Sequence, residues 1–166
     1  KIAGDATLED VIKANTKFDM ICLPGGMPGA ANLGDDKALM QLITDHLANP
    51  KFVLAAICAS PAVVLSQHGL LKGLPATCYP ADKFKQMLKD NGAVYQAKRV
   101  VIAQSTSNAL IVTSQGPGTA LEFSFVLVQL LLGYKAANTI ANAMLTLFGL
   151  DYVDQINELK SKNNEK

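Results

Sequence analysis

The residue best suited to carry out chemistry is Cys58, which lies between an apolar run and a proline. Residues 52–57 are short, apolar and without polar alternation, which is typical of a strand buried in a parallel sheet. Pro61 suits the first turn of a helix, where its missing N–H costs no hydrogen bond. This pattern places Cys58 on a tight strand-to-helix turn, the arrangement that lifts a nucleophile out of an α/β sheet. N–H groups at the start of such a helix favour the thiolate, so we predict a reactive cysteine rather than a buried structural one.

Two loops rich in glycine and proline each follow an apolar, strand-like run. Residues 24–29 read Pro-Gly-Gly-Met-Pro-Gly, and residues 114–118 read Ser-Gln-Gly-Pro-Gly. Neither loop has the spacing of a phosphate-binding motif, and the first alone would indicate only a connecting turn. The carboxyl ends of parallel strands meet at one edge of a sheet, so we expect both loops beside Cys58. The backbone amides of Gly26 and Ala59 are then candidate donors to an oxyanion next to the sulfur.

The rest of the chain alternates between strand-like and helix-like patterns. The expected strands are 18–23, 52–57, 74–78, 99–103 and 109–113, the last two forming a hairpin. The expected helices are 35–47, 61–68, 82–89, 119–132 and 135–148, and residues 6–14 indicate a short turn or helix. Such alternation predicts an α/β fold of the flavodoxin-like, doubly wound class, with a mostly parallel sheet and helices on both faces. We expect one domain over residues 1–149, followed by a polar tail over residues 150–166.

Composition narrows the classes of function. The 166 residues include 15 Lys+Arg and 14 Asp+Glu, for a net charge of +1, which argues against nucleic acid or an anionic membrane as a partner. No apolar run is long enough to span a bilayer. The three cysteines, Cys22, Cys58 and Cys78, form neither a metal-binding spacing nor an even disulfide set. We therefore expect free thiols in a reducing compartment, the cytoplasm, with no bound metal, and we predict that Cys22 and Cys78 are buried strand residues.

Three motifs in this order are similar to those of a known family. They are Leu23-Pro-Gly-Gly26, then Ala55-Ala-Ile-Cys-Ala59 with Pro61, then Thr113-Ser-Gln-Gly-Pro-Gly-Thr119 followed by Glu122-Phe123. Together they resemble the DJ-1/ThiJ/PfpI family, and Asp5-Ala-Thr-Leu-Glu-Asp10 resembles a segment of its DJ-1-like branch. The resemblance covers residues 5–147. It implies a flavodoxin-like domain of the class I glutamine amidotransferase type, usually a homodimer, that works without a cofactor.

The resemblance also implies a site and several activities. Cys58 would be the nucleophile or a redox-sensitive thiol. The pocket would be built by Gly25 and Gly26 at the oxyanion site, the N–H of Ala59, and a wall of Gly116 and Pro117. Family activities include glyoxalase, which converts methylglyoxal to lactate, protein deglycase acting on glycated side chains, oxidative-stress response and chaperone. An enzyme, a redox sensor whose cysteine oxidises to sulfinate, and a non-catalytic domain remain alternatives.

Two departures from the family pattern limit the resemblance. Many members place a histidine near the cysteine where this chain has Tyr79, which can donate a hydrogen bond but is a poor base at neutral pH. We interpret His46 and His68 as surface or structural residues, which argues against a Cys-His dyad. The family's leading β-α-β unit, whose first strand ends near a glutamate that hydrogen-bonds the thiolate, has no match in this chain. We therefore expect an N-terminally incomplete domain.

Overall fold

The computed structural model describes residues 4–146 and centres on a four-stranded sheet in the order β1-β2-β6-β5. Strands β1 (Met20–Leu23), β2 (Val53–Ile57) and β6 (Leu110–Ser114) are parallel. The last strand, β5 (Val100–Gln104), forms an antiparallel hairpin with β6. The predicted mostly parallel α/β sheet and its hairpin are therefore confirmed.

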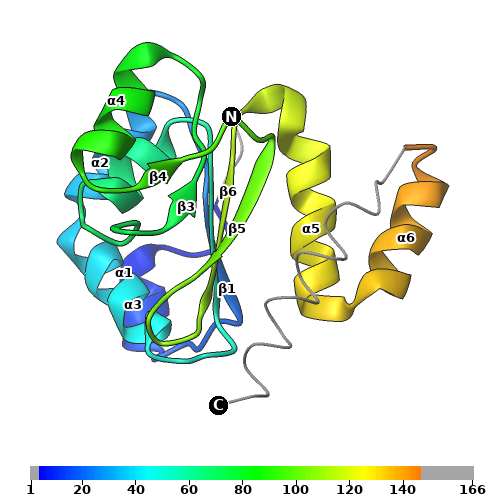
Figure 1. The fold of residues 1–166 in the computed structure, drawn as a ribbon. Helices are drawn as coiled ribbons and strands as arrows, with labels where there is room; N and C mark the ends of the chain where they lie inside the picture. The colour runs from blue at the N-terminus through cyan, green and yellow to red at the C-terminus, as the bar shows by residue number, and fades with distance from the viewer. Residues whose placement is uncertain (1–3, 147–166) are drawn as a thin grey trace.

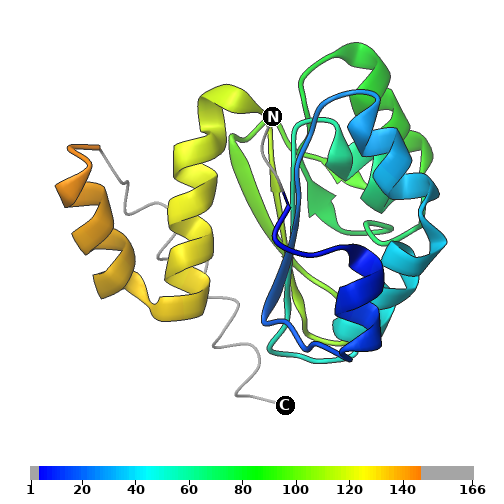
Figure 2. The ribbon, with the colours of Figure 1, turned by 180° about the vertical axis from the view of Figure 1, so that it is seen from behind.

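Helices cover both faces of this sheet (Figures 1 and 2). One face carries α1 (Leu8–Lys13), α2 (Gly29–Asp35), α3 (Lys37–Leu47), the wide helical segment η1 (Pro61–Ser66) and α4 (Asp82–Asp90). The other face carries α5 (Ala120–Leu132), and α6 (Tyr134–Ala143) packs against α5. A short 3₁₀ turn, η2 (Pro117–Thr119), leads from the end of β6 into α5.

The apolar core has two parts because successive residues of a strand point to opposite faces. On one face Leu54 of β2 packs in a cluster with Leu65 of η1. On the other face Val53 packs in a second cluster with Phe123 and Val126 of α5. Strand β2 is buried on both sides, as its continuous apolar run predicts.

Three local features differ from the sequence predictions. Helix α2 occupies residues predicted as loop and connection; its two glycines disfavour a helix, and packing against η1 stabilises it instead. At Gly34 a Cβ would lie 3.1 Å from the carbonyl oxygen of Val63, which shows how closely α2 approaches η1. Strand β3 (Pro75–Ala76) is shorter than predicted and pairs in parallel with an unpredicted strand, β4 (Val94–Tyr95). Two-residue strands carry too little periodicity to be predicted.

The helix after Cys58 begins at Pro61 as predicted, but its hydrogen bonds are wider than those of an α-helix. Residues 61–66 form a π-type segment, and Leu70 N–H donates to the Leu65 carbonyl five residues earlier. Helix α6 ends at Ala143, and the predicted end at residue 148 and the tail at 150–166 lie outside the described residues.

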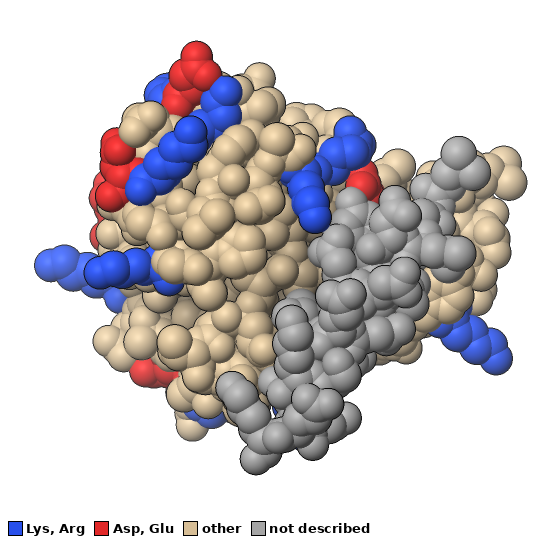
Figure 3. Space-filling model, in the orientation of Figure 1, with Lys and Arg blue, Asp and Glu red and all other residues tan. Residues whose placement is uncertain are grey.

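Charged side chains of both signs lie over the corner that α4 forms (Figure 3). Within residues 4–146, no helix has the length and apolar character needed to cross a membrane.

Candidate active site

Cys58 follows β2 directly and has a backbone φ of 68°, in the left-handed region that non-glycine residues rarely adopt. Its N–H donates to the Ser114 carbonyl over 3.0 Å, and its carbonyl accepts from the Tyr79 N–H over 2.8 Å. These bonds join the turn to the end of β6 and to the segment after β3. The structure thus places Cys58 on the predicted strand-to-helix turn, and its neighbours hold the strained backbone.

The Cys58 side chain is a free thiol at an intermediate level of exposure. Among residues 4–146, the sulfur has no hydrogen-bond partner. A sulfur that is reachable and unpaired can act as a nucleophile or take up oxygen.

Gly25 lies directly against Cys58. A Cβ added at Gly25 would lie 2.4 Å from the Cys58 Cβ, 2.9 Å from the Ile57 carbonyl oxygen and 3.1 Å from the Cys58 sulfur. No real Cβ tolerates such contacts, so the position requires glycine for close approach. The loop predicted to neighbour the cysteine therefore does so.

The backbone N–H groups of Gly26 and Ala59, near the cysteine, have no acceptor within the described residues. Gly26 has φ +91°, which only glycine adopts easily, and its carbonyl accepts from the Ala30 N–H at the start of α2. Ala59 is 2% exposed, and its carbonyl accepts from the first turn of η1. Both are the amides that the sequence pattern nominated as candidate oxyanion donors.

Gly116 packs against the Tyr79 ring, and together they form a wall on one side of the Cys58 sulfur. A Cβ at Gly116 would lie 3.3 Å from the Tyr79 ring atom Cδ2 and 4.0 Å from the Cys58 sulfur. The Tyr79 ring meets Phe84 edge-on and remains 43% exposed. Next to this wall is a cavity of about 210 Å³ lined by Tyr79, Pro80, Arg99, Gln115, Gly116, Pro117, Gly118 and Thr119. The cavity thus brings Tyr79, Gly116 and Pro117 together, whereas Cys58, Gly25, Gly26 and Ala59 do not line it.

Side chains that the sequence analysis did not single out hold these loops. Thr119 accepts the Gly116 N–H over 3.0 Å and contacts the Ser114 hydroxyl at 2.6 Å. Arg99 pairs with Glu122 at 2.6 Å and donates to the Gly118 carbonyl, also at 2.6 Å. These partners are far apart in sequence or lie within turn motifs, so periodicity gives no signal for them.

The comparison with protein families decides the relationship. A model described as the DJ-1/PfpI family matches residues 1–130. The chain belongs to the DJ-1/PfpI family. Its relatives place it in the DJ-1-like branch: it is 37% identical over 145 residues to "Protein DJ-1 homolog A" of Arabidopsis thaliana. That match covers 87% of this chain and 34% of the relative, so the chain spans about a third of that protein.

Two further comparisons agree with this assignment to DJ-1/PfpI. The structure matches one described as "Toxoplasma gondii DJ-1, oxidized" with a TM-score of 0.76 and 37% identity, covering 89% of this chain and 73% of that chain. A Caenorhabditis elegans relative, "Glutathione-independent glyoxalase DJR-1.2", is 34% identical over 140 residues, which cover 84% of this chain and 68% of the relative. The α/β fold with its mostly parallel sheet is that of the DJ-1 structures.

The other two cysteines of this DJ-1/PfpI chain differ from each other. The prediction that Cys22 is buried is wrong, because the residue is exposed. Its neighbours Ile21 and Leu23 pack into the core, so Cys22 points to the opposite face of β1, an edge strand of the described sheet. Cys78 is buried as predicted, but it lies beyond β3 rather than in a strand. Burial raises the pKa of Cys78 to about 12. Smaller electrostatic effects of Lys85 and Cys58 lower and raise this pKa, respectively.

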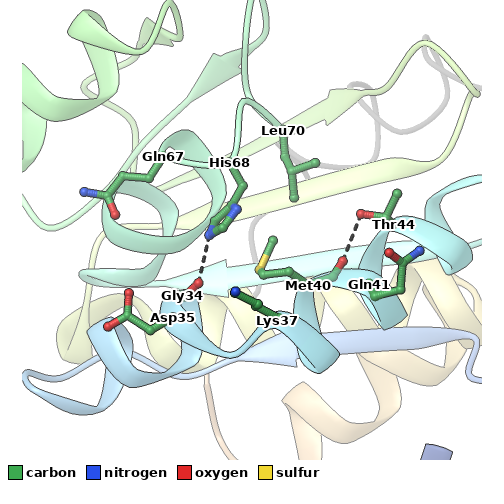
Figure 4. Close-up of a pocket in the computed structure, with 9 residues that line it drawn as sticks. All are labelled: Gly34, Asp35, Lys37, Met40, Gln41, Thr44, Gln67, His68 and Leu70. Carbon is green, nitrogen blue, oxygen red and sulfur yellow. Dashed lines mark hydrogen bonds between the residues drawn. The ribbon is translucent and has the colours of Figure 1, made fainter.

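Both histidines have structural roles. His46 is buried between the rings of Phe18 and Phe52, accepts the Phe18 N–H at Nε2 and donates to the Leu42 carbonyl from Nδ1. His68 donates from Nε2 to the Gly34 carbonyl over 2.8 Å. It lines a larger cavity of about 650 Å³ between α3 and the turn after η1, and none of the site residues above lines that cavity (Figure 4). In residues 4–146, no three His, Cys, Asp or Glu side chains gather as metal ligands would.

Proposed function

We propose that this protein is a cysteine-dependent glyoxalase or protein deglycase that needs no cofactor and acts on methylglyoxal-type carbonyls through Cys58. The observation that carries the proposal is the unpaired, partly exposed sulfur on a strained turn, with Gly25 packed against it. The unpaired amides of Gly26 and Ala59 support it as donors to a developing oxyanion. So does the similarity to a nematode protein named as a glutathione-independent glyoxalase.

The proposed reaction starts when the Cys58 thiolate adds to the aldehyde carbon of methylglyoxal. The carbonyl electrons move to oxygen, which the amides stabilise and a proton neutralises to give a hemithioacetal. Transfer of a proton from this carbon to the neighbouring ketone carbon, through an enediol, gives a lactoyl thioester. Water then cleaves the thioester, which releases lactate and returns the thiol. Overall, methylglyoxal and water become lactate with no external oxidant.

The cavity beside Tyr79, Gly116 and Pro117 suits a small substrate. Its volume of about 210 Å³ has room for a three-carbon dicarbonyl, and the exposed edge of Tyr79 leaves access for a glycated side chain. The proton transfer needs an acid/base group, and within residues 4–146 no carboxylate hydrogen-bonds Cys58. We assign this role to the glutamate at the end of the family's leading strand, which the family resemblance implies and which no residue of this sequence matches.

The test is lactate formation from methylglyoxal by the full-length protein. We expect Cys58→Ala to abolish it, while Cys22→Ala, which removes another accessible thiol, leaves it unchanged. Equal lactate production by Cys58→Ala and the wild type would rule out the proposal.

A redox role of the same thiol is the second candidate. Two equivalents of peroxide would convert the Cys58 thiol to a sulfinic acid and release two waters, and the same amides would bind the sulfinate oxygens. The similarity to a DJ-1 structure described as oxidized favours this role. Mass spectrometry after mild peroxide treatment tests it: Cys58 should gain oxygen before Cys22 and Cys78, and an earlier gain at either would contradict it.

We further propose that the protein acts as a homodimer, as the family resemblance implies, and in a reducing compartment, as the number and spacing of its cysteines indicate. Light scattering of the full-length protein gives its mass in solution, and a monomer at micromolar concentration would contradict the dimer.

A further inference from the structure

Ser60 is a polar residue in the middle of the apolar turn that carries Cys58. It is 0% exposed, and its hydroxyl donates a hydrogen bond to the carbonyl of Pro24, 36 residues earlier in the chain. The sequence analysis gave Ser60 no role. A buried hydroxyl needs a partner, and this one is the carbonyl that begins the glycine loop.

The bond acts on the part of the loop that touches the sulfur. The Pro24 carbonyl and the Gly25 N–H belong to one planar peptide unit, so a partner that holds the oxygen also fixes the direction of the N–H. Gly25 in turn lies against the Cβ and sulfur of Cys58. Ser60, two residues after Cys58, therefore connects this turn to the Pro24–Gly25 peptide, which packs against the cysteine.

Other hydrogen bonds of the loop lead elsewhere. The carbonyls of Gly26 and Pro28 accept from Ala30 and Asn32, which ties the loop to its own helix α2. Within the described part of the chain, the bond from Ser60 to Pro24 is the one hydrogen bond between residues 24–29 and residues 57–61. The β1–β2 pairing ends at Leu23 and Ala56, so beyond it the distance between the loop amides and the sulfur depends on this bond and on van der Waals contact.

We propose that Ser60 is a positioning residue of the Cys58 site, whose hydroxyl keeps the amides of Gly25 and Gly26 in place beside the sulfur. The inference rests on the proposed function for the reaction that the amides assist, but it applies to any anion at this sulfur. Loss of one well-placed oxyanion donor costs roughly 10²–10³-fold in kcat. Ser60→Ala loosens the donors without removing them, so we expect a fall in kcat of about 10- to 100-fold with little change in KM.

The chain offers a matched control in Ser66. Ser66 is the last residue of η1, the segment that directly follows Ser60, and it is 1% exposed. Its hydroxyl donates to the Ala62 carbonyl over 2.7 Å and accepts from the Asn91 side-chain amide over 3.3 Å. Ser66→Ala removes a buried hydroxyl of the same kind but leaves the glycine loop untouched. A merely structural role for these two buried serines would affect both variants alike.

Three measurements on the full-length protein separate the outcomes. The first is kcat and KM for methylglyoxal; the second is the rate of Cys58 alkylation by iodoacetamide between pH 6 and 9; the third is hydrogen exchange of residues 24–29. For Ser60→Ala we expect lower kcat, slower alkylation of Cys58 and faster exchange in the loop, and for Ser66→Ala none of these. The other titratable and charged groups around the site are Cys78, Tyr79 and the Arg99–Glu122 pair. Both variants retain them, so they do not account for a difference between the variants.

The proposal is overturned if Ser60→Ala alkylates and exchanges like the wild type, or if Ser66→Ala shows the same changes. Failure of the proposed function has a different signature, since a wild-type protein that makes no lactate still reports the role of Ser60 through alkylation and exchange.

Discussion

At the scale of single residues, the site depends on how closely Gly25 approaches Cys58. Gly25→Ala places a methyl group 2.4 Å from the Cys58 Cβ and 2.9 Å from the Ile57 carbonyl, so the loop must move away from the sulfur. We expect it to reduce Cys58 alkylation at least tenfold and to destabilise the fold by roughly 1–3 kcal/mol, as overpacking does. Alkylation rates and thermal unfolding measure both effects.

The same loop provides the control for that experiment. A Cβ at Gly29 meets no atom within 4 Å, and Gly29 is the first residue of α2, where alanine is a better helix former. Gly29→Ala should leave alkylation unchanged and stability equal or higher. Equal behaviour of the two variants would show that Gly25 has no special place at the sulfur.

Cys78 gives a pH dependence of stability. Burial raises its pKa from 9.0 to about 12, so above pH 9 the unfolded chain releases a proton that the folded chain keeps. Stability should therefore be unaffected below pH 9 and fall above it, by at most about 1.4 kcal/mol per pH unit. In Cys78→Ala this fall is absent. Urea unfolding of both proteins at pH 8 and pH 10 tests this, and an identical loss in both would contradict it.

At the scale of elements, α3 is fixed at its first turn by Asp36. The Asp36 carboxylate accepts from the N–H groups of Ala38 and Leu39 at 2.9 and 3.0 Å. Asp36→Ala leaves both donors to water, and we expect a loss of about 1 kcal/mol in the free energy of unfolding. Asp35→Ala, at the neighbouring exposed position without a capping bond, is the control. A stability loss no greater than that of the control would contradict the capping role.

The elements that the sequence predicted well are those with a strong local signal. The capping box of Thr7 and Asp10 at α1, the apolar run of β2 and the hairpin of β5 and β6 all depend on neighbouring residues. Helix α2 contains Gly29 and Gly34 and exists because it packs on η1, which no local pattern encodes. The exposed face of β1 at Cys22 likewise depends on what covers the sheet.

At the scale of the whole molecule, segments that are remote in sequence meet at the carboxyl ends of the parallel strands. The rule that ligands bind at the carboxyl ends of parallel strands was enough to place the loops at 24–29 and 114–118 beside Cys58. The individual ties between them were beyond sequence reasoning, since the Ser60–Pro24 bond and the fit of Gly116 against Tyr79 depend on side-chain placement in the folded core. Topology can be read from a pattern, but such contacts need coordinates.

The positive φ of Cys58, at the centre of this site, lowers the stability of the fold, and substitutions at Cys58 can measure by how much. With φ at 68°, its backbone favours glycine, and a left-handed conformation costs a residue with a Cβ on the order of 1 kcal/mol. Cys58→Gly and Cys58→Ala both remove the sulfur, but only glycine relieves the backbone. We expect Cys58→Gly to unfold with a free energy about 1 kcal/mol higher than that of Cys58→Ala, and neither to form lactate. Urea unfolding of the two variants decides the point: if the glycine variant is equally or less stable, the turn is not strained, and the structure does not trade stability for a partly exposed sulfur.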